Sequence, residues 1–157
     1  MKFVATKEGA LALEEIPPVL FGLLQAIPLR AASEDPRVES RFYPAPALDA
    51  LLVEDWKSFV RPELQETFLS AREVVLADLC GTLETEGGFS MKIPPNHMDP
   101  WLSTLNQARL AIAEENHFGE KDLSEEIVPD SSDPRPLALF QISFYGFLQE
   151  CLVKMQD

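Results

Sequence analysis

Two residues near position 115 have the types and the spacing of a metal-binding pair. Glu114 and His117 form a Glu-x-x-His pattern, which places a carboxylate and an imidazole on one face of a helix. Di-iron helical bundles need two such motifs together with two further glutamates. The other histidine, His97, has Pro94 three positions before it, so the second half of such a site is missing. The pattern therefore predicts a solvated helix end, with no metal bound.

The residues that could do covalent chemistry lack the surroundings that this chemistry needs. Ser90 follows Gly88 but has no second glycine after it, and a strand pattern continues from it, so it does not form a nucleophile elbow. Cys80 and Cys151 lie on apolar helical stripes, which predicts reduced, inert core thiols rather than nucleophiles or a disulfide. No catalytic residue and no cofactor is predicted, and these observations favour a protein that is not an enzyme.

Residues 120–133 are strongly acidic and raise the question of calcium binding. A calcium-binding EF-hand loop requires glycine at its sixth position. Counted from Asp122 the sixth residue is Ile127, and counted from Asp130 it is Arg135. We therefore expect a solvated, charged loop. Glycine-rich phosphate-binding motifs are absent from the sequence as well.

The candidate binding residues are Asn106 and Arg109. They lie three positions apart, beside the apolar stripe of a predicted helix, so they share a face. Asparagine can cross-link irregular backbone, and arginine can hold a carboxylate through two parallel hydrogen bonds. Both side chains could instead secure the adjoining connector or an acidic neighbour. The alternative that we retain is a polar contact point for a partner or a small anion.

Several segments of the chain resemble one bacterial family. The most specific is Trp101-Leu102-x-x-Leu105-Asn106-x-x-Arg109-Leu110, which looks like the signature helix of a family typical of actinobacteria and known as a domain of unknown function. Weaker likenesses are Asp35-Pro36 with the aromatic connector at 41–44, the strand at 89–93, and the closing pattern at 148–153. The resemblance implies a cytoplasmic protein, often encoded near the adaptor that feeds substrates to the Clp protease.

The chain departs from this family at two places. Asn106 is followed by Gln107, where Asn-Asp is common, and Glu114-Glu115 stand where the family has small residues and glycine. A role that depended on the missing carboxylate would be absent from this chain.

Charge and length limit the classes of function. The chain has 157 residues, with 26 acidic against 13 basic residues and a formal net charge of −13 at pH 7. Such a surface repels phosphate backbones and anionic lipids, so neither nucleic acid nor a membrane is expected as a partner. A basic protein partner is favoured. The two isolated cysteines and the lack of an apolar leader at residues 1–8 predict a cytoplasmic location. The oligomeric state is left open.

Hydrophobic periodicity predicts a single domain, residues 1–157, of the α+β class and mainly helical. About five helices are expected to pack around a central C-terminal helix. Residues 2–6 and 10–14 flank Glu8-Gly9 and predict a β-hairpin, and the alternation at 89–93 predicts a third strand beside it. Helices are expected over residues 17–27, 48–60, 62–83, 99–116 and 134–155.

Local signals predict how these helices begin and end. Pro28 should stop the first helix, and Pro62 should either break the second helix or start the third. Asp99 before Pro100 should cap the fourth helix, and Asp35-Pro36 should cap one extra helical turn. The last helix is apolar almost all round, which predicts burial on nearly every side.

The leading hypothesis is a non-enzymatic protein-interaction or regulatory domain. The second is a small-ligand-binding protein or an enzyme with a pocket between helices near Asn106 and Arg109. A weaker third is mimicry of nucleic acid by the acidic surface.

Overall fold

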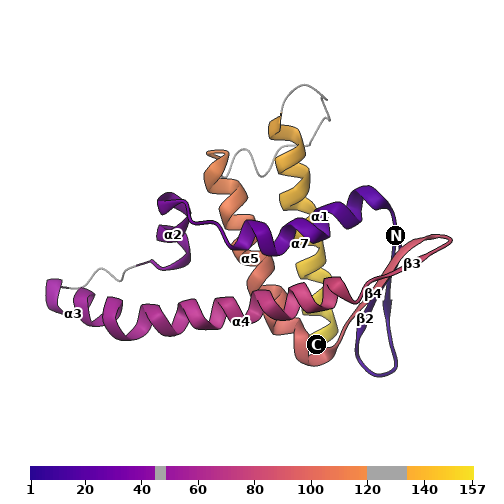
Figure 1. Cartoon of the computed structure of the whole chain (residues 1–157), viewed down its shortest axis with the longest axis horizontal. Helices are drawn as coiled ribbons and strands as arrows, with labels where there is room; N and C mark the ends of the chain where they lie inside the picture. The colour runs from indigo at the N-terminus through magenta and orange to yellow at the C-terminus, as the bar shows by residue number, and fades with distance from the viewer. Residues whose placement is uncertain (45–48, 120–133) are drawn as a thin grey trace.

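The computed structural model of the chain describes residues 1–44, 49–119 and 134–157. It is mainly helical, with a small antiparallel sheet at one end, as predicted (Figure 1). The regular elements of these residues, in chain order, are β1 (Lys2–Ala5), β2 (Leu11–Ile16), α1 (Pro18–Ala31), α2 (Pro36–Phe42), α3 (Ala50–Asp55), the π-helix η1 (Trp56–Val60), α4 (Arg61–Cys80), β3 (Leu83–Thr85), β4 (Gly88–Ile93), the 3₁₀ turn η2 (Pro95–His97), α5 (Met98–Glu115) and α7 (Pro134–Gln156).

The four-stranded sheet has the order β1-β2-β4-β3, with every neighbouring pair antiparallel. The predicted hairpin and its third strand are therefore confirmed, and β3 is an edge strand that the alternation pattern did not indicate. A bulge in β2 places Glu15 at φ 52°. Because of the extra residue, Leu13 and Ile16 both point inward, and neither has any exposed surface.

Helix α5 lies in the middle of the helical layer and contacts α1, α2, α4 and α7. Its inward face holds Trp101, Leu105, Ala108 and Ile112, all of them buried as predicted. These side chains join the sheet residues and the inner face of α7 in one hydrophobic core. Figure 1 shows α5 and α7 side by side, with α4 crossing below them.

The start of α5 differs from the prediction. The helix begins at Met98, and Asp99 lies within its first turn instead of capping it. The 3₁₀ turn η2 continues directly into the helix, so no side-chain cap is formed there. The Asp99 carboxylate instead accepts a hydrogen bond of 2.8 Å from Nε2 of Gln156 at the end of α7.

The C-terminal helix α7 packs on the other helices, but it is not buried on nearly every side as predicted. Its inner face holds Ile142, Tyr145, Leu148 and Leu152. Part of its apolar surface is turned outward: Leu137 is 61% exposed, and Phe140 and Phe147 are almost half exposed. By length and composition alone, residues 135–156 would be long and apolar enough to cross a membrane, yet a third of that stretch is buried inside this domain.

Neither proline breaks its helix. Pro28 lies inside α1, which continues to Ala31. The lost backbone hydrogen bond falls in the last turn, and both Pro28 and Ala31 are buried there, which favours the continued helix. Pro62 lies in the first turn of α4, and helical backbone runs without a break from α3 through η1 into α4. The wider π-turn before the proline accommodates the missing N–H group.

Helix α2 packs through a small second cluster. Asp35 caps it by accepting a hydrogen bond of 2.9 Å from the Arg37 backbone N–H, and the helix extends over seven residues rather than one turn. Val38 and Phe42 are buried against Ala111 of α5. The predicted anchoring by the aromatic pair after Arg41 is confirmed, since the neighbouring Tyr43 ring also packs against α4.

Candidate functional site

A groove of about 700 Å³ lies between α5 and α7, and Arg109 forms part of its wall. The apolar part of the lining comes from Leu102, Phe147 and Val153. Phe147 and Val153 are 49% and 48% exposed, so the groove has an open hydrophobic side. Lys154 adds a second cation at the groove. The predicted pocket beside Arg109 therefore has a physical counterpart.

The Arg109 guanidinium is held in place by two features of α7. Its Nη1 donates a hydrogen bond of 2.7 Å to Oε1 of Gln149, whose Nε2 in turn donates to the Leu102 carbonyl at 3.3 Å. The guanidinium also lies against the backbone of Gly146, where an added Cβ would approach Arg109 Cζ and Nη2 to 3.3 Å. Nε of Arg109 is buried and has no hydrogen-bond partner among the described residues. The guanidinium thus has a fixed position and an unpaired donor.

Asn106 lies at the surface of α5 and does not line this groove. The structure therefore separates the two predicted binding residues: Arg109 lies in the groove, and Asn106 faces solvent one turn earlier. The residue next to Asn106, Gln107, is instead buried, at 3% exposure, and both polar atoms of its amide lack a partner among the described residues.

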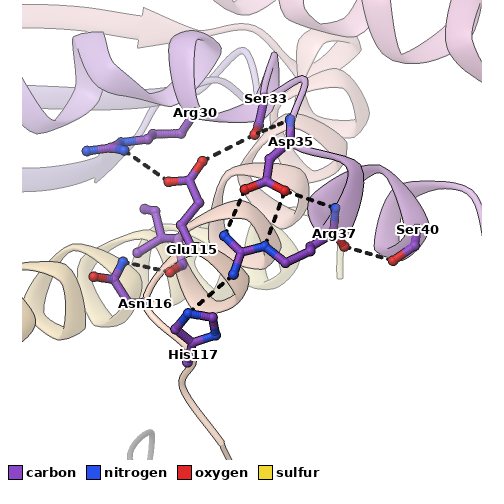
Figure 2. A network of polar contacts seen from close by, with 9 residues as sticks. Arg30, Ser33, Asp35, Arg37, Ser40, Glu115, Asn116 and His117 are labelled. Atoms are coloured by element: carbon purple, nitrogen blue, oxygen red, sulfur yellow. Dashed lines mark hydrogen bonds and ion pairs between the residues drawn. The ribbon is translucent and has the colours of Figure 1, made fainter.

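Glu114, Glu115 and His117 make polar contacts at the end of α5, and Figure 2 shows those of Glu115 and His117. Glu114 pairs with Arg41 at 3.2 Å, and the neighbouring Glu115 pairs with Arg30, also at 3.2 Å. Nε2 of His117 lies 3.2 Å from Nη1 of Arg37. The described residues contain no group of three or more His, Cys, Asp or Glu side chains that could hold a metal ion. The network ties α5 to the end of α1 and to α2.

Within this network, Arg37 lowers the pKa of the Asp35 carboxyl. Arg37 donates from its side chain and from its backbone N–H to Asp35, and these hydrogen bonds hold the pKa of the Asp35 carboxyl below its ordinary value. The same pairing raises the pKa of the Arg37 guanidinium. Asp35 is therefore charged at neutral pH and remains a helix cap.

A second polar cluster joins the end of α4 to the start of α5. Asp78 accepts a hydrogen bond of 2.8 Å from Nε1 of Trp101, and one of its oxygens lies 2.9 Å from Nδ1 of His97. Because a carboxylate only accepts, Nδ1 carries the proton, which leaves Nε2 of the imidazole as an acceptor. An oriented imidazole of this kind can act as a base, but His97 lines neither the Arg109 groove nor the two described next. The cluster thus connects α4, η2 and α5 through their side chains.

The two cysteines have different surroundings. Cys80 is exposed, which corrects the prediction that it is a core thiol, because it lies on the outer side of the last turn of α4. It lines an apolar groove of about 450 Å³ between α1 and α4, together with Leu29, Leu69 and Leu76. Cys151 is half-buried, and burial raises the pKa of its thiol. This shift disfavours the reactive thiolate form of Cys151.

The helical arm formed by α3 and η1, residues 50–60, contains no buried residue. Leu51 is 80% exposed and Phe59 is 71% exposed, although the periodicity of this segment is that of a core helix. Figure 1 shows α3 at the far end of the α4 rod, away from α1, α5, α7 and the sheet. The arm therefore presents exposed apolar side chains at a distance from the main core.

An acidic groove of about 760 Å³ follows the arm, between α4 and the start of α5. Its rim holds Glu63, Glu66 and Asp99, and its floor is made of small side chains such as Ser70 and Ala71. Within the described part of the chain, Glu63 and Glu66 have no cation within 4.0 Å. The groove therefore presents unneutralised negative charge.

A family model described as "Domain of unknown function (DUF2017)" matches residues 5–156. The chain belongs to this family. The match extends over β1 to α7 and confirms the resemblance that the Trp101–Leu110 helix first indicated. The comparison with curated proteins and the comparison with solved structures found no match.

The DUF2017 domain contains functional candidates that the sequence did not indicate. Gln149 and Gly146 hold the Arg109 guanidinium from the opposite helix, about 40 residues later in the chain. No local motif could have indicated them, because the pairing depends on how α5 and α7 cross. The exposure of the arm could not be predicted either, since periodicity indicates that a helix has an apolar face but not which element packs against that face.

Proposed function

We propose that this DUF2017 domain is a non-enzymatic, cytoplasmic protein-interaction module, and that its partner docks on the helical arm and the acidic groove that follows it. The observation that supports this proposal is the arm itself. It holds six large apolar side chains, none of them buried: Leu51, Leu52, Val53, Trp56, Phe59 and Val60. Exposed apolar clusters of this kind mark interaction sites in folded proteins.

The charges beside the arm define the partner. Phe59 precedes Glu63 by four residues and Glu66 by seven, spacings that bring side chains to one side of a helix. The cations that precede them in the sequence are already engaged, because Lys57 pairs with Glu54 and Arg61 pairs with Glu39. A partner that covers this surface therefore needs apolar side chains followed by lysine or arginine. A basic amphipathic helix meets both requirements.

A second copy of this chain fits the surface less well. Each copy has a formal charge of −13 and would place Glu63 and Glu66 near the same carboxylates of its twin. Like charges brought together at an interface select against that pairing. The partner is therefore a different protein with a basic surface.

The fluorescence of Trp56 reports on the arm directly, because this indole is only partly buried there. We expect a synthetic amphipathic helix of leucine and lysine to shift its emission at low salt and less so at high salt, since screening weakens charge pairing. Phe59→Ser should weaken binding by roughly tenfold. Leu83→Ser is the matched control, because Leu83 is 68% exposed on the sheet edge.

Charge is tested separately from apolar contact. The double variant Glu63→Gln/Glu66→Gln should weaken binding and flatten its salt dependence, whereas Glu84→Gln/Glu86→Gln makes the same change in net charge on the β3–β4 hairpin and should not. Equal losses in both doubles would refute the proposed surface. So would sedimentation as a dimer through the arm, which would make a second copy the occupant.

The natural partner can be identified by photocrosslinking. A photoreactive residue at position 59 should trap a protein through a basic amphipathic helix, and the same residue at position 83 should not. Crosslinks from position 59 to acidic or irregular segments would contradict the proposal.

A further inference from the structure

The groove between α5 and α7 lies on other elements than the arm and has a different chemistry. We infer that this groove is a binding site for a carboxylate attached to an apolar group, with Arg109 as the residue that holds the carboxylate. The inference rests on the unpaired donors of Arg109, the apolar wall beside it and the local charge. It is independent of the arm and its partner.

Arg109 lacks the carboxylate partner that four other arginines have, as does Arg72, whose Nη1 donates instead to the Ala31 carbonyl at 3.3 Å. Arg30, Arg37, Arg41 and Arg61 each have a carboxylate within 4.0 Å. In the described chain, Arg109 has none, and the partner of its Nη1 is the neutral amide of Gln149. A part-buried guanidinium without an anion is an incomplete arrangement, since arginine usually forms charge-assisted pairs there.

The guanidinium is preorganised for a ligand. Gln149 fixes Nη1, and the glycine at position 146 allows Nη2 and Cζ to lie close to the α7 backbone. Nε remains buried and without a partner among the described residues, which is costly unless a further group completes its hydrogen bonding. A carboxylate satisfies two N–H donors of one guanidinium at once.

The rest of the wall requires an apolar group on the ligand. Leu102, Phe147 and Val153 line the groove, and the last two are about half exposed without a ligand. A volume of about 700 Å³ lies within the range of small-molecule sites. A carboxylate alone would leave this apolar wall in water.

The local charge favours a monoanion. Arg109 and Lys154 contribute two positive charges at the groove, and Glu150 contributes one negative charge. The sum is +1, on a chain whose formal charge is −13. A single carboxylate balances this groove, whereas a phosphate dianion would exceed its charge and meet repulsion from the surrounding surface.

The test uses the full-length chain and phenylbutyrate, with phenylbutanol as the uncharged analogue. We expect phenylbutyrate to bind with a Kd on the order of millimolar and to shift the NMR signal of the Arg109 Nε–H group. Phenylbutanol should bind at least roughly tenfold more weakly, because it cannot form the charge-assisted pair. Equal binding of the two compounds, or no binding of phenylbutyrate, would overturn the inference.

Two variants separate binding from folding. Arg109→Gln should weaken the binding of phenylbutyrate by roughly tenfold or more. Lys92→Gln removes one charge from an exposed position of β4 and should leave this binding unchanged. Gln149→Glu places a carboxylate against Arg109 within the protein, so the chain should stay folded and still lose the ligand. Retained binding in Gln149→Glu, or equal losses in Arg109→Gln and Lys92→Gln, would refute the assignment.

The source of the carboxylate is decided by a second pair of probes. A short peptide ending in leucine is compared as the free acid and as the C-terminal amide. If the free acid binds more tightly than phenylbutyrate and the amide does not bind, the natural ligand is the end of a peptide chain. If phenylbutyrate binds more tightly than the peptide, it is a free organic acid.

Discussion

The hydroxyl of Tyr145 lies in the core, and it makes the stability of the domain depend on alkaline pH. The residue has no exposed surface, its hydroxyl donates a hydrogen bond of 2.6 Å to the Leu23 carbonyl, and it accepts one of 2.7 Å from Nε2 of Gln141. Burial raises the pKa of Tyr145 to about 12. An unfolded tyrosine titrates near pH 10.

The sign and size of the effect follow from this difference. The folded state keeps the phenol proton more firmly, so the stabilisation is fully present below about pH 10 and is lost as the pH rises towards 12. At about pH 11 the loss amounts to about 1.4 kcal/mol, and it approaches roughly 2.7 kcal/mol above pH 12.

Urea unfolding of the wild type and of Tyr145→Phe at about pH 8 and about pH 11 measures this loss. At pH 8 the variant should be less stable by about 1–3 kcal/mol, because Gln141 and the Leu23 carbonyl lose their partner. At pH 11 this gap should shrink by about 1.4 kcal/mol, since only the wild type has the buried phenol. Tyr43→Phe is the control. It keeps the Tyr145 phenol, so it should lose more stability between about pH 8 and about pH 11 than Tyr145→Phe does. A difference between wild type and Tyr145→Phe that stays constant across this range would refute the reasoning.

Four further substitutions test the packing of the fold. Gly88→Ala should destabilise the domain by more than about 3 kcal/mol in urea unfolding, because φ is 125° and the new Cβ would lie 2.5 Å from a backbone oxygen of β2. Gly22→Ala should instead stabilise α1 by up to about 1 kcal/mol, because nothing lies within 4 Å of the new Cβ. Trp101→Phe should cost about 2–4 kcal/mol in the same assay, since it leaves a cavity and removes the indole hydrogen bond to Asp78; an unchanged midpoint would show that this bond contributes nothing. Leu51→Ser should change the free energy of unfolding by less than about 0.5 kcal/mol, because the side chain is exposed. A larger loss would mean that the arm is packed in solution.

The regular elements could be predicted wherever periodicity and local turn signals agree. The β1–β2 hairpin around Gly9, the strand β4 and the inner face of α5 all follow from alternation or from helical spacing. The prediction for Pro28 was wrong for a physical reason: a proline in the last turn removes only one hydrogen bond, and tertiary burial outweighs that loss. Pro62 lies in the first turn of α4, which agrees with the alternative that it starts the third helix.

The arm and α7 show what periodicity leaves undetermined. A stripe of large apolar side chains predicts that one face is covered, and at Phe59 and Leu137 nothing within the described chain covers it. Because α7 is apolar on several sides, the sequence does not decide which side is buried; in the structure Tyr145 and Leu148 lie in the core, whereas Leu137 is exposed.

The candidate site could be predicted only in part. Arg109 stands out by type and spacing, and the structure gives it a groove. Its neighbours Gln149 and Gly146 come from another helix and have no local signature. The pairing of Asp78 with His97 was missed for the same reason, because the two residues meet only when α4 and η2 are brought together.

The π-turn at Trp56–Val60 also bears on how this family can change over evolutionary time. A π-turn is one residue longer than the α-helical turn that it replaces. Deletion of a single codon within it would restore a regular helix and leave the arm and α4 in nearly their present relation, because the wider turn absorbs the extra residue. A deletion within the α-helical part of α4 would instead rotate the arm by about 100°. The π-turn is therefore a position at which the chain can lose one residue while Phe59 and its neighbours keep their direction.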